Sequence, residues 1–300
     1  MDRIEGMIVK SSGGLYDILC DGGKVISCRA KGLFRHRDLT PTVGDNVILS
    51  DDGGGYFIDE IKERKSGLIR PPLANLCYLF IVIPSARPLP DFFTADKLTA
   101  IAVHNGITPV IVASKCSLDR DSAENTLSIY KNAFDTFVTD AVQGIGIDGL
   151  YRFIEEKCNG GVSAFAGASG AGKSTLMNAL FPELALGTGE VSRKTGRGRH
   201  TTRSVELFTT KCGALIADTP GFTMLDFERF DFFDLEDLPH TFPEIERVLG
   251  NCRYSKCTHR KEEGCAILEE VRRGKMSPSR HGSYIALYEI LKNKHSWDKK

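Results

Sequence analysis

The sequence has no long hydrophobic run, no excess charge of either sign and no internal repeat. No apolar stretch approaches the ~20 residues that a helix needs to cross a bilayer, and the first residues lack the basic-then-apolar pattern of a secretion signal. The 39 Lys and Arg residues balance the 39 Asp and Glu residues, so bulk charge predicts no polyanionic partner. We therefore expect no membrane contact, and any nucleic-acid surface must come from local clusters of cations.

Cysteine is present but unevenly spaced. Six of the nine cysteines are scattered, whereas three crowd between Cys252 and Cys265. Such an odd set without a secretion signal predicts reduced thiols and a cytoplasmic protein. The length of 300 residues favours two or three domains, and nothing in the sequence requires more than a monomer.

Residues 1–68 are expected to form an OB-like β-barrel. The strands "LYDILC" and "KVISCRAK" flank a "DGG" turn, and "VGDNVILS" and "GYFIDEI" flank "DDGGG", a pattern typical of hairpins. Short strands without a helical stretch favour a small barrel. Such barrels often bind RNA, but a purely structural module remains an equal alternative.

Residues 69–234, which begin within the Pro-containing connector "RKSGLIRPPLAN", alternate apolar strands with helical stretches, which predicts an α/β domain with a parallel sheet. Residues 235–300 are predicted to form a helical domain rich in metal ligands. The fold class is therefore multidomain, with a barrel, an α/β domain and a helical domain in that order.

The segment "GASGAGKST" follows the apolar strand "VSAFA" and precedes a predicted helix. This is the setting of a phosphate-binding loop, in which backbone N–H groups curl around phosphate. Lys173 is suited to reach the β- and γ-phosphates, and the Ser174 hydroxyl to ligate Mg²⁺. The expected phosphate-binding residues are Gly167, Ala168, Ser169, Gly170, Ala171, Gly172, Lys173, Ser174 and Thr175.

Further along the chain, "DTPG" places Asp218 and Gly221 after an apolar strand. Asp218 can hold Mg²⁺ through water, and the Gly221 N–H can bind a γ-phosphate. Thr201 or Thr202, in the intervening "GRGRHTTR", can complete the Mg²⁺ shell. Together these motifs resemble a translation-factor-class GTPase.

Such a GTPase needs a base-reading segment, and none follows Gly221. Before the phosphate loop, however, the strand "TPVIVA" ends in Ser114, Lys115, Cys116 and Ser117, and "VTDAVQGIGIDGL" resembles the loop behind a base reader. The α/β domain is therefore expected to be a circularly permuted GTPase domain.

This order, together with "PTVGD", "RPPLAN", "GRGRHTTR", "DTPGF" and the terminal Cys/His set, resembles the ribosome small-subunit-dependent GTPases (the RsgA type). The resemblance covers nearly the whole chain. It implies slow hydrolysis of GTP to GDP with Mg²⁺, stimulation by the small ribosomal subunit, contact with its rRNA, and a role in late subunit assembly.

One departure concerns the base. The family reads guanine with Asn-Lys-x-Asp, but Ser114 and Ser117 stand at the Asn and Asp positions. A serine cannot make the bidentate, charge-assisted pair of a carboxylate, which corresponds to a loss of roughly 1–3 kcal/mol of discrimination. We therefore expect relaxed guanine selectivity. Asp119 lies two residues too far along the chain to be a good substitute.

A second feature concerns catalysis. Phe222 follows D-x-x-G, where many GTPases carry a water-orienting Gln, so slow intrinsic turnover is expected. The resemblance implies that His200 replaces that group, acting with Lys173 and Thr202. A solvated loop residue or an RNA contact is the alternative role for His200.

The spacing Cys252-x4-Cys257-x-His259-x5-Cys265 supplies four ligands for one structural Zn²⁺. Nearby cations predict either rRNA contact or a solvated rim. They are Arg253, Lys256, Arg260, Lys261, Arg272, Arg273, Lys275 and Arg280. Two other functions stay open from the residues alone, namely a P-loop ATPase or kinase of different specificity and a non-hydrolysing, nucleotide-dependent RNA-binding module.

Overall fold

The computed structural model describes residues 3–32, 34, 40–69, 71–184, 205–218 and 232–294. Contacts divide the chain into two compact units. The first contains Met1–Tyr78, Arg152–Phe165 and Phe181–Phe222, and the second contains Leu79–Tyr151, Ala166–Leu180 and Thr223–Lys300. No helix among the described residues is both long enough and apolar enough to span a membrane.

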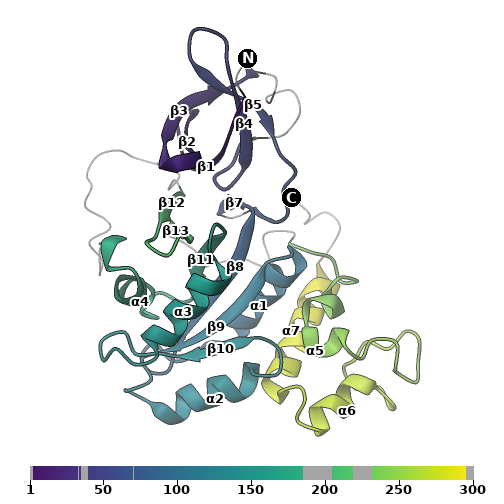
Figure 1. The fold of residues 1–300 in the computed structure, drawn as a ribbon. Coiled ribbons are helices and arrows are strands. Elements are labelled where there is room, and N and C mark those ends of the chain that lie inside the picture. The colour runs from purple at the N-terminus through teal and green to yellow at the C-terminus, as the bar shows by residue number, and fades with distance from the viewer. Residues whose placement is uncertain are drawn as a thin grey trace. The chain divides into compact units, whose positions relative to one another are not determined.

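The first unit begins with a closed set of strands (Figure 1). These are β1 (Ile4–Ser12), β2 (Leu15–Cys20), β3 (Val25–Ala30), β4 (Asn46–Asp51) and β5 (Tyr56–Ile61). Their order is β1-β2-β3-β5-β4, and β1 pairs with both β2 and β4. Inward-facing Ile8, Ile18 and Leu49 are fully buried. The expected barrel is confirmed, with the additional strand β1, which the turn pattern does not reveal.

The "PTVGD" segment links the barrel to the connector that follows it. Gly44 has φ +92°, and a Cβ there would meet the Ala74 carbonyl oxygen at 2.0 Å, so only glycine fits. The buried Asp45 carboxylate accepts from Arg64 Nε at 2.6 Å and from Thr42 N at 2.7 Å. The Pro-containing connector itself forms a hairpin of β6 (Gly67–Ile69) and β7 (Pro72–Ala74).

The first unit also holds strands from the second half of the chain. β11 (Val162–Ala166) pairs in parallel with β13 (Leu215–Asp218), and β12 (Glu206–Thr209) pairs antiparallel with β13. β12 also pairs with β1 of the barrel, where Lys10 lies opposite Glu206 and their side chains form an ion pair of 2.9 Å. The barrel is therefore joined directly to α/β strands by backbone pairing.

The second unit contains the sheet order β10-β9-β8. Its strands are β8 (Leu76–Pro84), β9 (Thr108–Ser114) and β10 (Asp135–Val138), and β9 and β10 are parallel. The accompanying helices are α1 (Phe92–His104), α2 (Arg120–Tyr130) and α4 (Lys173–Leu180). Helix α3 (Ile147–Lys157) begins in this unit, and its residues from Arg152 on belong to the first. Continuous burial over residues 79–84 of β8 and 109–114 of β9 matches strands that are covered on both faces.

The C-terminal helices pack against the sheet domain within the second unit. They are α5 (Pro243–Glu246), α6 (Ala266–Arg272) and α7 (Pro278–Asn293), and α7 lies beside α1 (Figure 1). Arg280 of α7 is completely buried and forms ion pairs with Asp96 of α1 at 2.7 Å and Glu244 of α5 at 2.8 Å. Arg280 was expected on a basic surface, so that assignment is wrong.

Candidate nucleotide-binding site and metal centre

The phosphate loop has the backbone that its glycines predict. Gly167 has φ +136°, and a Cβ there would meet the Val82 carbonyl oxygen at 2.3 Å, so a side chain cannot be accommodated. Gly172 has φ +92° and precedes the first residue of α4. The loop therefore delivers the chain into a helix N-terminus, where unpaired N–H groups favour anions.

The Lys173 side chain folds over this loop. Its Nζ donates to the carbonyl oxygens of Gly167 and Ala168, both at 2.8 Å. Burial lowers the pKa of Lys173 to about 8, because a desolvated ammonium is disfavoured. Ser174 and Thr175 are exposed at the start of α4. The loop thus offers a cation and a hydroxyl at one helix end, the groups that phosphate and Mg²⁺ require.

The "SKCS" segment contacts the phosphate loop within the same unit. Ser114 Oγ donates to the Ala171 carbonyl oxygen at 2.6 Å, and Lys115 Nζ donates to the Gly170 carbonyl oxygen at 2.7 Å. Lys115 has φ +59°, a conformation that a non-glycine residue rarely adopts and that often marks a functional loop. The segment therefore lies beside the loop that follows it by more than fifty residues, as the permuted order requires.

The other two residues of this segment face different ways. Cys116 is buried against Ala113 and Ala123, and burial raises the pKa of its thiol, so its side chain serves packing. Ser117 is exposed, and its hydroxyl donates to Asp140 Oδ2. Asp119 accepts from Ser122 N at 2.9 Å and caps α2.

Asp140 contacts the "SKCS" segment, although the sequence analysis does not single it out. Its side chain is nearly fully buried behind Ser117. Burial would raise its pKa, but hydrogen bonds from Ser117 and from the backbone N–H groups of Gln143 and Val142 hold that pKa below its ordinary value. The carboxylate is therefore ionised at neutral pH. The available clue was an acidic residue directly after "FVT", inside the loop expected behind the base reader.

Several predicted residues lie outside the described residues. These are His200, Thr201, Thr202, Gly221 and Phe222, as well as the side chain of Asp218, whose backbone ends β13. Their proposed roles therefore rest on the sequence.

The Cys/His set comes together as one centre. The ligand atoms of Cys252, Cys257, His259 and Cys265 all lie within 4.8 Å of one another. Cys252 Sγ is 3.5 Å from His259 Nδ1 and 3.9 Å from Cys265 Sγ. Burial lowers the pKa of His259 and favours its neutral, ligating form. Three thiols and an imidazole at these separations fit one tetrahedral Zn²⁺.

Surrounding groups fix the centre's backbone. The Glu262 carboxylate accepts from Thr258 N at 2.8 Å and from Arg260 N and Lys261 N, each at 3.0 Å. His281 Nε2 of α7 donates to the His259 carbonyl oxygen at 2.8 Å. Hydrogen bonds to Glu262 within the ligand loop and from His281 of α7 therefore fix the loop's conformation, as expected for a structural metal site.

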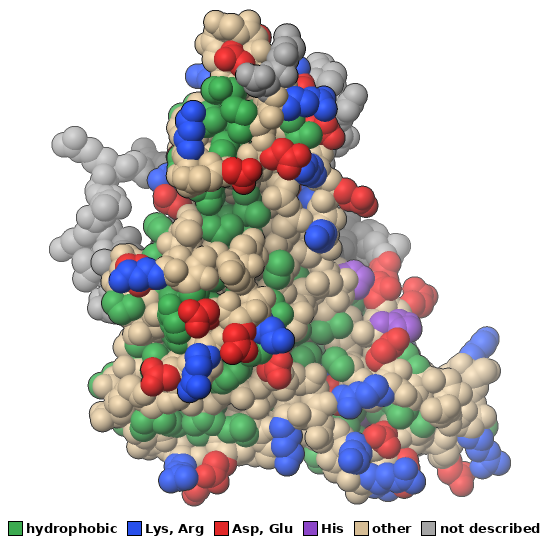
Figure 2. Space-filling model, viewed as in Figure 1, with side chains coloured by type: hydrophobic (Ala, Val, Ile, Leu, Met, Phe, Trp, Pro, Cys, Tyr) green, Lys and Arg blue, Asp and Glu red, His purple; other side chains and the backbone are tan. Residues whose placement is uncertain are grey.

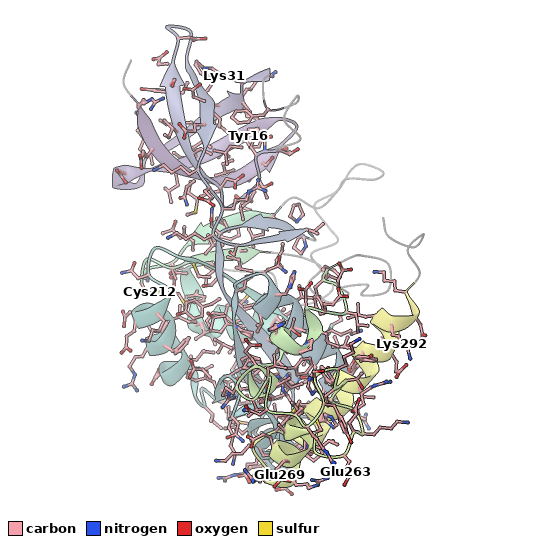
Figure 3. All side chains as sticks on the ribbon, turned by 90° about the vertical axis from the view of Figure 1, so that its right-hand side faces the viewer. Tyr16, Lys31, Cys212, Glu263, Glu269 and Lys292 are labelled. Carbon is pink, nitrogen blue, oxygen red and sulfur yellow. The ribbon has the colours of Figure 1, made fainter. Side chains whose placement is uncertain are left out.

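The cations around this centre are mixed with acids. Figure 2 shows Lys and Arg side chains interspersed with Asp and Glu over the C-terminal region, and Figure 3 shows Glu263 and Glu269 at the same end of it. Glu269 pairs with Arg272 and Arg273. Arg260 pairs with Glu289 and stacks 4.2 Å from the Tyr288 ring centre. The predicted basic surface is therefore smaller than its sequence suggests.

Fold and site together define a circularly permuted P-loop GTPase with an N-terminal barrel and a C-terminal Cys/His metal centre. Sequence profiles agree, since the RsgA GTPase profile matches residues 61–228 and the RsgA N-terminal domain profile matches residues 5–56. The chain belongs to the RsgA GTPase family.

Individual relatives match over almost their full length. The "Small ribosomal subunit biogenesis GTPase RsgA" of Bacillus velezensis is 38% identical, with 97% of this chain and 98% of the relative covered. The protein of that name from Caldanaerobacter subterraneus is also 38% identical, with 98% of each covered. The crystal structure of YjeQ from Thermotoga maritima matches with a TM-score of 0.81 at 28% identity, covering 98% of this chain and 100% of that one. YloQ, described as a circularly permuted GTPase, matches with a TM-score of 0.77 at 30% identity, covering 98% and 96%.

Proposed function

We propose that this protein is a GTP hydrolase that acts in the biogenesis of the small ribosomal subunit. The observation that carries the proposal is the contact of Ser114 and Lys115 with the phosphate loop, which brings a base-reading segment and a phosphate-binding segment into one site. The names of the curated relatives supply the partner. A cytoplasmic location follows from that partner.

Within this site each group has a defined task. Lys173 and the loop N–H groups bind the β- and γ-phosphates, and Ser174 ligates Mg²⁺ together with Thr202 and Asp218. Mg²⁺ neutralises phosphate charge as it develops in the transition state. Phe222 cannot orient water, so hydrolysis by the free protein is slow, and His200 is the residue of this chain suited to orient the attacking water on the subunit.

The metal-centre face supports contact with rRNA. Arg253, Lys256 and Lys261 in the ligand loop are exposed, and Tyr254 in the same loop is 49% exposed. The Arg253 guanidinium lies 5.6 Å from the Tyr254 ring centre. An exposed aromatic ring among cations suits stacking on an unpaired base and neutralisation of phosphates. The protein then binds the subunit as a monomer through this face.

The decisive experiment measures phosphate release from GTP with and without purified small ribosomal subunits. We expect slow release alone and a large stimulation by subunits. Lys173→Ala should abolish both, whereas Lys97→Ala, a change on α1 where the side chain lies over the Phe93 ring, should leave both intact. GTP turnover that subunits do not change would overturn the assignment to subunit biogenesis.

A further inference from the structure

A base reader must match the hydrogen-bonding edge of its purine. Guanine offers two donors, N1–H and N2–H, whereas adenine presents an acceptor at N1. A reader that can only accept therefore selects guanine and repels adenine. A lone serine hydroxyl does not discriminate, because it can both donate and accept. Relaxed selectivity was expected because a serine cannot make the bidentate, charge-assisted pair of a carboxylate.

The structure shows that Ser117 is not alone. Its hydroxyl proton is directed to Asp140 Oδ2, and its backbone N–H also points at that oxygen, at 3.4 Å. Only Ser117 of this pair is exposed, while Asp140 is 4% exposed behind it. With the proton committed to an ionised carboxylate, the lone pairs of Ser117 Oγ are left to accept from a ligand.

Asp140 is itself fixed in place. Its other oxygen, Oδ1, accepts from Val142 N at 3.0 Å and Gln143 N at 3.2 Å. Its backbone pairs with Ile145 in both directions, at 2.9 and 3.0 Å. The hydrogen bonds to Oδ1 and to the Asp140 backbone fix the orientation of the carboxylate. Oδ2 therefore stays in place to accept the Ser117 hydroxyl proton.

The two loops are also tied to each other and to the sheet. Cys116 N donates to the Thr139 carbonyl oxygen at 3.2 Å, and Thr139 N donates to the Ala113 carbonyl oxygen at 2.7 Å. Gly146 has φ +70°, and a Cβ there would meet the Val138 carbonyl oxygen at 2.0 Å. The pairing of Ser117 with Asp140 is therefore built into the backbone of both loops.

We propose that Ser117 and Asp140 act as one guanine-reading pair, in which Asp140 positions the Ser117 hydroxyl as an acceptor for the purine N1–H and N2–H. The carboxylate that position 117 lacks is thus supplied by Asp140, 23 residues further along the chain, and acts through the Ser117 hydroxyl. This inference rests on the proposed GTP hydrolase and assigns its base selectivity. It replaces the expectation of relaxed selectivity with a preference for guanine.

The test is equilibrium binding of GDP, ADP and IDP in the presence of Mg²⁺ to the full chain. We expect the wild type to prefer GDP over ADP by about tenfold to a hundredfold, as bidentate base contacts do. IDP, which lacks the N2 amino group, should bind with intermediate affinity. A wild type that binds GDP and ADP equally would overturn the inference, and one that binds no nucleotide would overturn the proposed function instead.

Asp140→Asn is the sharpest variant. Its Oδ1 can still accept from Val142 N and Gln143 N, but its NH₂ group donates to Ser117 Oγ and releases the serine proton. The GDP to ADP ratio should then fall toward one, mainly through tighter ADP binding. Loss of affinity for both nucleotides in equal proportion would show that Asp140 only shapes the loop.

Two further variants keep the test decisive. Exchanging the pair, Ser117→Asp with Asp140→Ser, returns the carboxylate to the exposed position and should restore the preference for GDP even if Asp140→Asn folds poorly. Asp119→Asn, which retains the cap of α2, should leave the ratio unchanged. A ratio that the exchange lowers as much as Asp140→Asn does would contradict the pairing.

Discussion

Arg280 of α7 and Asp96 of α1 form an ion pair of 2.7 Å in which neither side chain is exposed. The Glu244 carboxylate accepts from Arg280 Nε at 2.8 Å and from Arg280 Nη2 at 2.9 Å. The rings of Tyr130, Phe134 and Phe242 lie within 5.4 Å of the same group. One arginine thereby joins the C-terminal helices to the sheet domain within the second unit.

Replacing Arg280 by Leu should therefore destabilise the protein strongly. The substitution leaves Asp96 and Glu244 buried without their partner, and breaking a buried ion pair from one side costs about 3–5 kcal/mol. The measurement is the free energy of unfolding from urea titration. Arg272→Leu is the matched control, because the Arg272 side chain is 71% exposed and exposed pairs contribute about 0–1 kcal/mol. Equal unfolding midpoints for the two variants would contradict a stabilising role for Arg280.

The metal centre predicts both the zinc content of the protein and a contribution of zinc to its stability. We expect one tightly bound Zn²⁺ per chain, which Cys257→Ser should remove, because each thiol supplies one of four ligands. Cys212→Ser, a change in the first unit, should retain the metal. Zinc content is measured by mass spectrometry, and loss of metal should lower the temperature at which the C-terminal region unfolds, since metal binding supplies folding free energy. Equal zinc in the two variants would contradict the ligand set.

The parts of the fold that could be predicted are those with a clear local pattern of apolar, polar and turn residues. Strands β2 to β5 follow from alternation and turn residues, and β8 and β9 from their continuous apolar runs. Helix boundaries are less well predicted. Helix α2, for example, begins at Arg120 because the Asp119 side chain caps its first turn. β7 begins at Pro72, a residue that disfavours strands except at edges, so its hairpin escapes a pattern search.

The contact between Ser114 and the phosphate loop could be anticipated from the sequence. A nucleotide carries a base and phosphates, so the segment that binds the base must lie near the loop that binds the phosphates. The role of Asp140 could not, since its partner Ser117 lies 23 residues away and on a different loop. Arg280 was misjudged for a similar reason. An arginine in a basic segment suggests a surface, and only the fold brings Asp96, 184 residues distant, against it.

His200 offers a prediction that rests on the sequence, since the residue lies outside the described residues. His200→Ala should lower the subunit-stimulated rate of GTP hydrolysis by about a hundredfold or more, the usual contribution of a positioned proton-transfer or water-orienting group. Nucleotide affinity should change little, because the residue acts in the transition state. Single-turnover hydrolysis on subunits and equilibrium binding of GDP measure the two effects. Equal losses in rate and affinity would remove the catalytic assignment.

Lys173 predicts a pH dependence of nucleotide binding. Burial places the pKa of this lysine at about 8, and bound phosphates favour the ammonium and raise that pKa. Between pH 8 and the raised value, the complex holds a proton that the free protein has lost. Affinity should therefore be greatest below about pH 8 and fall as the pH rises, by at most about tenfold per pH unit.

Calorimetric titration with GDP in two buffers of different ionisation enthalpy measures this proton directly. We expect proton uptake at about pH 8.5 and little from this group at about pH 7. Lys173→Arg keeps the positive charge but titrates far above this range, so its complex should form without that uptake. If the variant and the wild type take up the same number of protons, another group titrates on binding. The Lys173 side chain would then already be fully protonated before the phosphates bind.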